Sequence, residues 1–168
     1  MNKVGTGKTI VSLLIALHSI RDLPPPMDVV VIAPIGIYNN FVVDYTRLEG
    51  HKGRLNLINY PMNELIADVN MKQVRHDFSK KIVIIDEAHR LLNKEIADSR
   101  EAGAITAFHT IVQDIYFINQ IYKSKRCIVM TGTPVQRDLS DVCRLLNFVG
   151  KTAKFTRETY APITLSDD

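Results

Sequence analysis

The sequence contains no tryptophan and only two cysteines among its 168 residues. Cys127 and Cys143 lie far apart and match no metal or disulfide spacing, so neither a zinc module nor a disulfide-held secreted domain is indicated. The longest apolar stretch near the start, residues 10–17, is too short to cross a bilayer, and it lacks the basic leader of a signal peptide. The sequence therefore predicts an intracellular protein of the cytoplasm or nucleus, with no membrane partner.

Neither sign of charge predominates, because 21 lysines and arginines nearly balance 18 acidic residues and leave a net charge of +3. This mild excess permits contact with nucleic acid but does not demonstrate it. The hydrophobic content of 46% is enough for one well-packed domain, and neither repeats nor low-complexity tracts interrupt the chain. We expect a domain over residues 1–150, followed by a C-terminal tail over residues 151–168.

Short apolar runs rich in valine and isoleucine predict buried parallel strands. These runs are residues 29–33, 55–59, 82–86 and 127–131. Helical apolar patterns separate them, at about residues 8–21, 37–48, 62–77, 104–122 and 139–149. Residues 93–103 carry many charges and no apolar periodicity, which predicts a surface loop. Strands that alternate with helices predict right-handed crossovers and a three-layer α/β sandwich.

A phosphate-binding loop is predicted at the start of the chain. Its residues are Gly5, Thr6, Gly7, Lys8 and Thr9. The glycines let backbone N–H groups close around phosphate oxygens, and the following helix directs its positive end at the same anion. Lys8 would contact the β and γ phosphates of ATP, and the Thr9 hydroxyl would bind Mg²⁺. The alternative is a glycine-rich turn that opens a helix by chance, and Asn2 stands where the general pattern has glycine.

Two carboxylates, Asp86 and Glu87, directly follow the apolar run of residues 82–85. Open α/β sheets bind their ligands at the carboxyl ends of the strands. We therefore expect Asp86 to hold Mg²⁺, directly or through water, and Glu87 to orient and deprotonate a water molecule. An isolated Asp-Glu pair would more commonly be a solvated strand end. The phosphate loop upstream favours the catalytic interpretation.

Two threonines, Thr131 and Thr133, flank Gly132 after the next apolar run. Small hydroxyl residues at this place can respond to the γ-phosphate and pass a change to neighbouring elements. Taken alone, Thr-Gly-Thr-Pro predicts only a turn. Its position after the other two motifs favours a functional interpretation.

The ordered motifs resemble the first RecA-like lobe of superfamily 2 helicases and translocases. Within that superfamily, they look most like the Swi/Snf-type ATPases and the helicase-like transcription ATPases of large DNA viruses. Residues 86–93, DEAHRLLN, are close to the group's D-E-A-H-R-[LI]-K-N. Residues 131–137, TGTPVQR, are similar to its T-G-T-P-x-Q-N, although Arg137 replaces the usual asparagine. Residues 31–41 resemble motif Ia, and residues 58–60 resemble motif Ib.

The resemblance implies a RecA-like P-loop NTPase fold that uses ATP and Mg²⁺ to track along duplex DNA. It also implies that four residues of the DEAH and threonine motifs couple ATP hydrolysis to movement. These residues are His89, Thr131, Thr133 and Gln136. It further implies that Pro34 and Tyr60 lie near the nucleic-acid backbone. A viral transcription-type ATPase would be found in a viral factory or virion.

Two departures from the family pattern bear on activity. No residues before Asn2 supply the strand that leads into the phosphate loop, so we expect a sheet incomplete at its N-terminus, with an uncovered edge at residues 127–131. The chain ends at Asp168 without a second lobe, whose arginine finger can be worth about 10³–10⁵ in rate. We therefore expect ATP hydrolysis to need a second RecA-like lobe or partner chain, and little or no activity from this chain alone. The alternatives are an inactive truncated lobe that binds nucleotide or a partner, and a different P-loop enzyme such as a small kinase.

Overall fold

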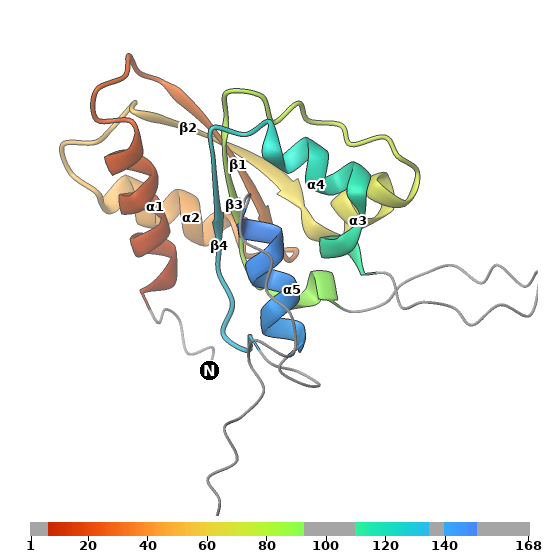
Figure 1. Ribbon diagram of the computed structural model, residues 1–168. Coiled ribbons are helices and arrows are strands. Elements are labelled where there is room, and N and C mark those ends of the chain that lie inside the picture. The colour runs from red at the N-terminus through yellow and green to blue at the C-terminus, as the bar shows by residue number, and fades with distance from the viewer. Residues whose placement is uncertain (1–6, 93–109, 135–139, 151–168) are drawn as a thin grey trace, which may run out of the picture.

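The computed structural model describes residues 7–92, 110–134 and 140–150, and over these residues the fold is α/β (Figure 1). The strands are β1 (Met27–Ala33), β2 (Leu55–Pro61), β3 (Ile82–Ile85) and β4 (Arg126–Val129). The α-helices are α1 (Lys8–Ser19), α2 (Tyr38–Arg47), α3 (Met62–Asn70), α4 (Ile115–Tyr122) and α5 (Ser140–Val149). Short 3₁₀ segments, η1 and η2, cover Ala88–Leu92 and Ile111–Gln113. None of the helices in these ranges is long and apolar enough to cross a membrane.

The four strands form one parallel sheet in the order β2-β1-β3-β4, with α1 and α2 on one face and α3, α4 and α5 on the other (Figure 1). Successive residues of β1 point to opposite faces. Val29 and Val31 belong to the core cluster under α1, whereas Val30 and Ile32 belong to the cluster under α3 and α4. Burial on both faces explains why the inner strands, β1 and β3, are nearly continuous apolar runs. The predicted three-layer sandwich is confirmed.

The strands match their predicted positions to within two residues at each end. β1 begins at Met27 and β2 continues to Pro61, whereas β3 stops at Ile85. Single hydrogen bonds extend the ladder beyond the strand ends. The Asp86 N–H donates to the Ile32 carbonyl at 2.8 Å, and the Met130 N–H donates to the Ile85 carbonyl at 2.8 Å. The residues that follow β3 and β4 are thus held against the sheet.

Two predicted helices are too long, and local backbone geometry explains both differences. The helix predicted over residues 62–77 ends as α3 at Asn70, because Lys72 adopts a left-handed conformation with φ of 57°. In the described part of the helix predicted over residues 104–122, η2 is followed by an extended Asp114, and α4 begins only at Ile115. Residues 93–109 lie outside the described residues, as does the loop predicted within them.

Candidate functional site

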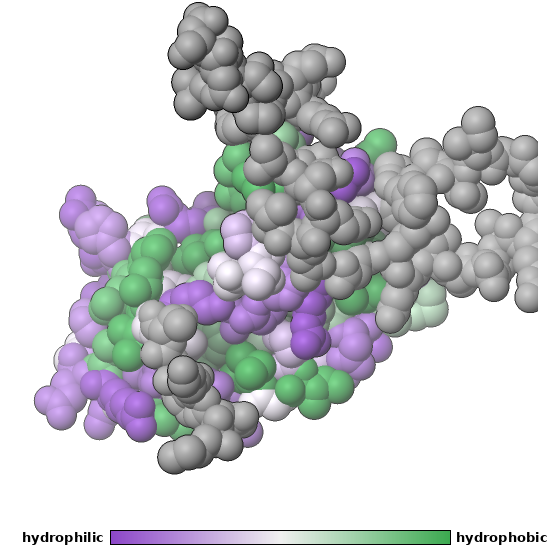
Figure 2. Space-filling model, turned by 90° about the horizontal axis from the view of Figure 1, so that it is seen from below, coloured by the Kyte–Doolittle hydropathy of each residue, from purple (hydrophilic) through white to green (hydrophobic). Residues whose placement is uncertain are grey.

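The predicted motifs meet at the carboxyl ends of β1, β3 and β4, at the lower end of the sheet in Figure 1. Figure 2 views the molecule from this end, where hydrophilic side chains occupy the centre of the face and hydrophobic ones border them. Parallel strands bring the segments after each strand together at one edge. Residues that are far apart in the sequence therefore share one surface.

Lys8 reaches this surface because α1 begins there. Gly7, the residue before the helix, has a left-handed φ of 71°, and its carbonyl accepts the Val11 N–H at 3.0 Å. A Cβ at Gly7 would meet no atom within 4 Å, so it is the backbone conformation that favours glycine. Thr9 is the second residue of α1 and is partly buried. The predicted loop residues Gly5 and Thr6 lie outside the described residues.

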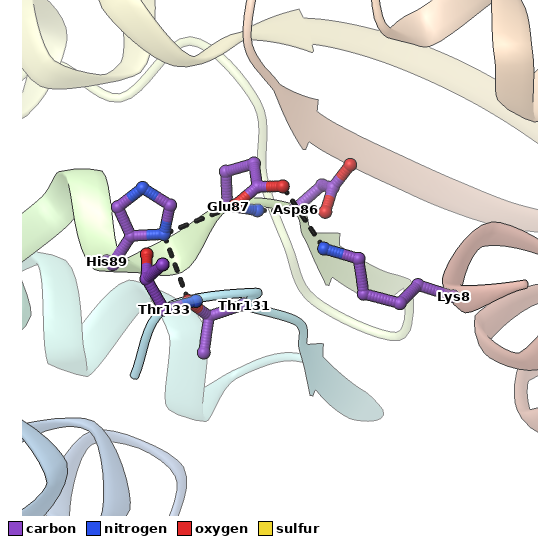
Figure 3. A network of polar contacts seen from close by, with 6 residues as sticks. All are labelled: Lys8, Asp86, Glu87, His89, Thr131 and Thr133. Carbon is purple, nitrogen blue, oxygen red and sulfur yellow. Dashed lines mark hydrogen bonds and ion pairs between the residues drawn. The ribbon is translucent and has the colours of Figure 1, made fainter. Parts of the chain in front are cut away.

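A chain of polar contacts joins the three motifs (Figure 3). Lys8 Nζ lies 3.1 Å from Glu87 Oε1, and the other carboxylate oxygen, Oε2, lies 3.2 Å from His89 Nδ1. The same imidazole nitrogen lies 2.9 Å from Thr131 Oγ1. The Thr133 N–H donates to Thr131 Oγ1 at 3.1 Å, which fixes the turn after β4. Glu87 is therefore the centre of a path from α1 to the threonine motif.

The backbone at Glu87 is unusual for a residue with a side chain. Its φ is 50°, in the left-handed region, and non-glycine residues held there carry strain. Hydrogen bonds on both sides hold the conformation. The Glu87 N–H donates to Asp86 Oδ1 at 2.9 Å, and the Ala88 N–H donates to the Met130 carbonyl at 2.9 Å. This turn directs the Glu87 side chain toward Lys8 and His89 (Figure 3).

The two adjacent carboxylates have pKa values that move in opposite directions. Burial raises the pKa of Asp86, which is 7% exposed, and the hydrogen bond from the Glu87 N–H only partly opposes that rise. Burial would also raise the pKa of Glu87, but the hydrogen bond and charge of Lys8, with smaller effects of His89, outweigh it and lower that pKa. Opposite shifts in neighbouring acids are typical of sites where the two acids have different roles.

The groups at this site suit a magnesium–nucleotide complex better than a metal held by protein alone. Within the described ranges, no group of three or more His, Cys, Asp and Glu side chains could hold a metal ion. Mg²⁺ commonly binds through one or two protein oxygens and shares the phosphates of its substrate. Asp86 and Thr9 offer such oxygens. Gly132 leaves room beside the Lys8 ammonium, because a Cβ there would lie 3.4 Å from Nζ.

Comparison with known proteins assigns the family. A family model described as the SNF2-related domain matches residues 45–164, more than half of the chain. The chain belongs to the SNF2-related domain family. The domain of this family has a RecA-like fold, which agrees with the parallel sheet and the helices on both of its faces. The match includes the acidic motif after β3 and the threonine motif after β4.

The relatives of this SNF2-related domain are much longer proteins. A probable ATP-dependent DNA helicase of Arabidopsis thaliana, CHR23, is 27% identical over 168 residues, covering 88% of this chain and 14% of the relative. The ISWI chromatin-remodeling complex ATPase ISW1 of Saccharomyces cerevisiae is 28% identical over 88% of this chain and 13% of its own length. A protein of Invertebrate iridescent virus 3 that carries the name of a helicase, 087L, is 23% identical over 90% of this chain and 18% of its own length. The chain thus spans less than a fifth of each of these relatives.

The two predicted nucleic-acid contacts lie in different environments in this SNF2-related domain. Pro34 lines a surface cavity of about 580 Å³ together with His89 and Arg90. Tyr60 is only 1% exposed, so its side chain offers no surface to a nucleic acid. Its position corrects the prediction for Tyr60, whose aromatic ring packs in the core. The predicted coupling residue Gln136 lies outside the described residues.

A polar network around Tyr60 was not predicted from the sequence. The Tyr60 hydroxyl donates to Asp68 Oδ2 at 2.7 Å, and Arg75 Nε lies 2.8 Å from the same oxygen. Arg75 also pairs with Glu64 at 2.7 Å. Burial, followed by the hydrogen bond to Asp68, raises the pKa of Tyr60 strongly. The signal in the sequence was an acid on the apolar face of α3, where Leu65, Asp68 and Val69 are all buried.

Proposed function

We propose that this SNF2-related domain is the ATP-binding lobe of an ATP-dependent nucleic-acid translocase. In this proposal the lobe hydrolyses ATP to ADP and phosphate when a second RecA-like lobe is paired with it. The observation that carries the proposal is the contact chain from Lys8 through Glu87 and His89 to Thr131. Two relatives of this domain, a probable ATP-dependent DNA helicase and a chromatin-remodeling complex ATPase, support the same function.

Lys8 and Glu87 have complementary roles in this proposal. The ammonium of Lys8 binds the terminal phosphates, and it leaves Glu87 to do so. Glu87 Oε1, which then has no ammonium beside it, accepts the proton of the attacking water. A glutamate of ordinary pKa is ionised at neutral pH, so the carboxylate can act as a general base without Lys8 beside it. When bound, Mg²⁺ neutralises phosphate charge, and the oxygens of Asp86 and Thr9 would hold it.

His89 and Thr131 connect the site to the rest of the lobe. His89 Nδ1 is within 3.2 Å of both Glu87 Oε2 and Thr131 Oγ1. A shift of the Glu87 carboxylate therefore changes the contacts of the imidazole, and through Thr131 it reaches the Thr133 N–H. This two-sided contact supports the coupling role of His89, Thr131 and Thr133. We extend this role to Gln136 on the basis of the family resemblance alone.

Duplex DNA is the proposed track, and it passes the end of the sheet that carries the motifs. Pro34 and Arg90 line the same cavity as His89, so a backbone phosphate that contacts Arg90 lies close to the coupling residue. The cavity also includes Asn63, whose amide can donate to phosphate oxygens. Among the groups that line it, Arg90 and Asn63 replace Tyr60 as the proposed contacts.

The test uses a version of the protein that carries both lobes, assayed for ATP hydrolysis with and without duplex DNA. Wild type should be stimulated by DNA. Glu87→Gln should retain ATP and Mg²⁺ but lose turnover, because an amide cannot accept the proton of the water. Glu64→Gln is a matched control, since it also neutralises one acid in an ion pair with a basic residue. Undiminished hydrolysis by Glu87→Gln would remove Glu87 from the mechanism. Nucleotide binding by wild type without hydrolysis would favour the alternative of an inactive binding module.

A further inference from the structure

A second surface feature lies at the opposite end of the sheet from Lys8, where β1, β3 and β4 begin (upper end in Figure 1). It is a groove of about 500 Å³ with an apolar floor and a lysine rim. We call its apolar lining the floor, which comes from the loop before β1 and the first residue of β1, and its lysines the rim, which come from the loops before β3 and β4. The floor is Leu23, Pro24 and Met27, and the rim is Lys80, Lys123 and Lys125. We refer to these six residues as the lysine groove.

Backbone hydrogen bonds hold the loops of the lysine groove in place. Ser79 and Ser124 form an isolated antiparallel bridge, and the Lys125 N–H donates to the Lys81 carbonyl at 2.8 Å. The two rim loops are therefore tied to each other. Lys80 is held with a left-handed φ of 62°, a strained conformation for a residue with a side chain. Because the loops are fixed, a ligand would meet a preformed surface.

Within the described part of the chain, the ammonium groups of Lys80, Lys123 and Lys125 form no ion pair. The Lys123 ammonium donates instead to the neutral amide of Gln120 at 3.1 Å. Asp77 is close enough to the groove for the charge of Lys123 to act on its carboxylate. Hydrogen bonds from Ser79 are the main cause of the lowered pKa of Asp77, and the charges of Lys81 and Lys123 lower it further.

We propose that the lysine groove docks an acidic peptide segment of a partner protein. An aliphatic side chain of the peptide lies on the floor formed by Leu23, Pro24 and Met27, and carboxylates on either side of it contact the rim lysines. Charge complementarity favours an acidic ligand, and the apolar floor favours one with a hydrophobic anchor. No aromatic ring among the described residues lines the groove, so this part of the chain gives it no stacking platform of the kind that single-stranded nucleic acids use.

Binding of a short fluorescent peptide to the full chain, followed by fluorescence anisotropy at low salt, tests this proposal. The probe is Asp-Glu-Asp-Leu-Asp-Glu-Asp, and a second probe replaces its leucine with serine. The protein variant is Lys123→Gln with Lys125→Gln. The control is Lys52→Glu, an exposed site outside the groove. Both variants lower the net charge by the same amount, and thermal melting checks that each is folded.

The double variant should bind the leucine probe about tenfold more weakly than wild type, whereas Lys52→Glu should bind it nearly as well. The serine probe should also bind more weakly to wild type, because it leaves the apolar floor uncovered. Absence of binding, or equal losses in the double variant and the Lys52 control, would overturn the proposal. Equal binding of the two probes would also overturn it. Displacement of the probe by duplex DNA, with DNA binding lost in the double variant, would assign the groove to nucleic acid instead.

Discussion

Replacing Glu87 with glutamine should strengthen nucleotide binding, even though it removes a residue that we propose as catalytic. In this structure Lys8 Nζ is bonded to Glu87 Oε1 at 3.1 Å. A phosphate that binds Lys8 must displace this carboxylate, so the free energy of the ion pair opposes nucleotide binding. Glutamine has nearly the same shape as glutamate but carries no charge. It therefore leaves Lys8 less strongly held before the nucleotide arrives.

The size of the effect follows from the exposure of the pair. The Lys8 and Glu87 side chains are 32% and 31% exposed, so water screens much of their attraction. Pairs of this kind contribute about 0.5–1 kcal/mol, which corresponds to roughly two- to fivefold in a dissociation constant. Removal of a negative charge beside the phosphates adds to the gain in the same direction.

Titration calorimetry with ADP and with a non-hydrolysable ATP analogue measures this effect directly. Glu64→Gln serves as the control, because it removes the same charge from an ion pair with Arg75. We expect tighter binding for Glu87→Gln and unchanged binding for Glu64→Gln. Unchanged or weaker binding by a folded Glu87→Gln variant would refute the idea that Lys8 must leave Glu87 to bind phosphate.

Three further predictions follow from the same contacts. Lys8→Ala should weaken ATP binding by roughly tenfold to a hundredfold in calorimetry, because a charge-assisted phosphate contact is lost. Tyr60→Phe should lower the free energy of unfolding in urea by about 2 kcal/mol, since a buried carboxylate loses a donor, whereas Tyr38→Phe, whose hydroxyl donates to a carbonyl, should cost about 1 kcal/mol. Burial would raise the pKa of Asp114, but its contact with Lys72 helps to hold that pKa below the ordinary 3.8. The ionised carboxylate therefore adds to the free energy of unfolding above about pH 4, and this contribution is lost as the pH falls further. The urea stability difference between wild type and Asp114→Ala should therefore be about 1 kcal/mol at pH 7 and smaller at pH 3.

The layered fold was predictable mainly from its inner strands, β1 and β3, which are buried on both faces. Strands of this kind are nearly continuous apolar runs, which distinguishes them from the helices between the strands. Helix ends were less predictable. The left-handed Lys72 that ends α3 is neither glycine nor proline, so no residue type marks the break. The start of α4 did carry a signal, because Asp114 is a favoured cap and accepts the Phe117 N–H at 3.1 Å.

The site was predictable as a set of residues but not as a geometry. Motif order predicted that Lys8, Glu87 and Thr131 would lie at one edge of the sheet, because parallel strands share that edge. Lys8 pairs with Glu87 rather than with Asp86 because of the left-handed turn at Glu87, and no sequence pattern indicates that turn. The burial of Tyr60 depends on Asp68, eight residues later and in another element.

Burial and the Glu87 turn together explain how two adjacent acids differ. The Asp86 backbone N–H continues the sheet by bonding to Ile32, so its side chain stays at the buried strand end, where desolvation raises its pKa. The left-handed turn then directs the Glu87 side chain to a position between Lys8 and His89, where the hydrogen bond and charge of Lys8 outweigh burial and lower the pKa of Glu87. If Glu87 instead had an ordinary extended backbone, the side chain would leave this position and the lysine would lose its partner. The strain at Glu87 is therefore the local cost of holding a charged base within reach of Lys8, His89 and the phosphates that we propose bind there.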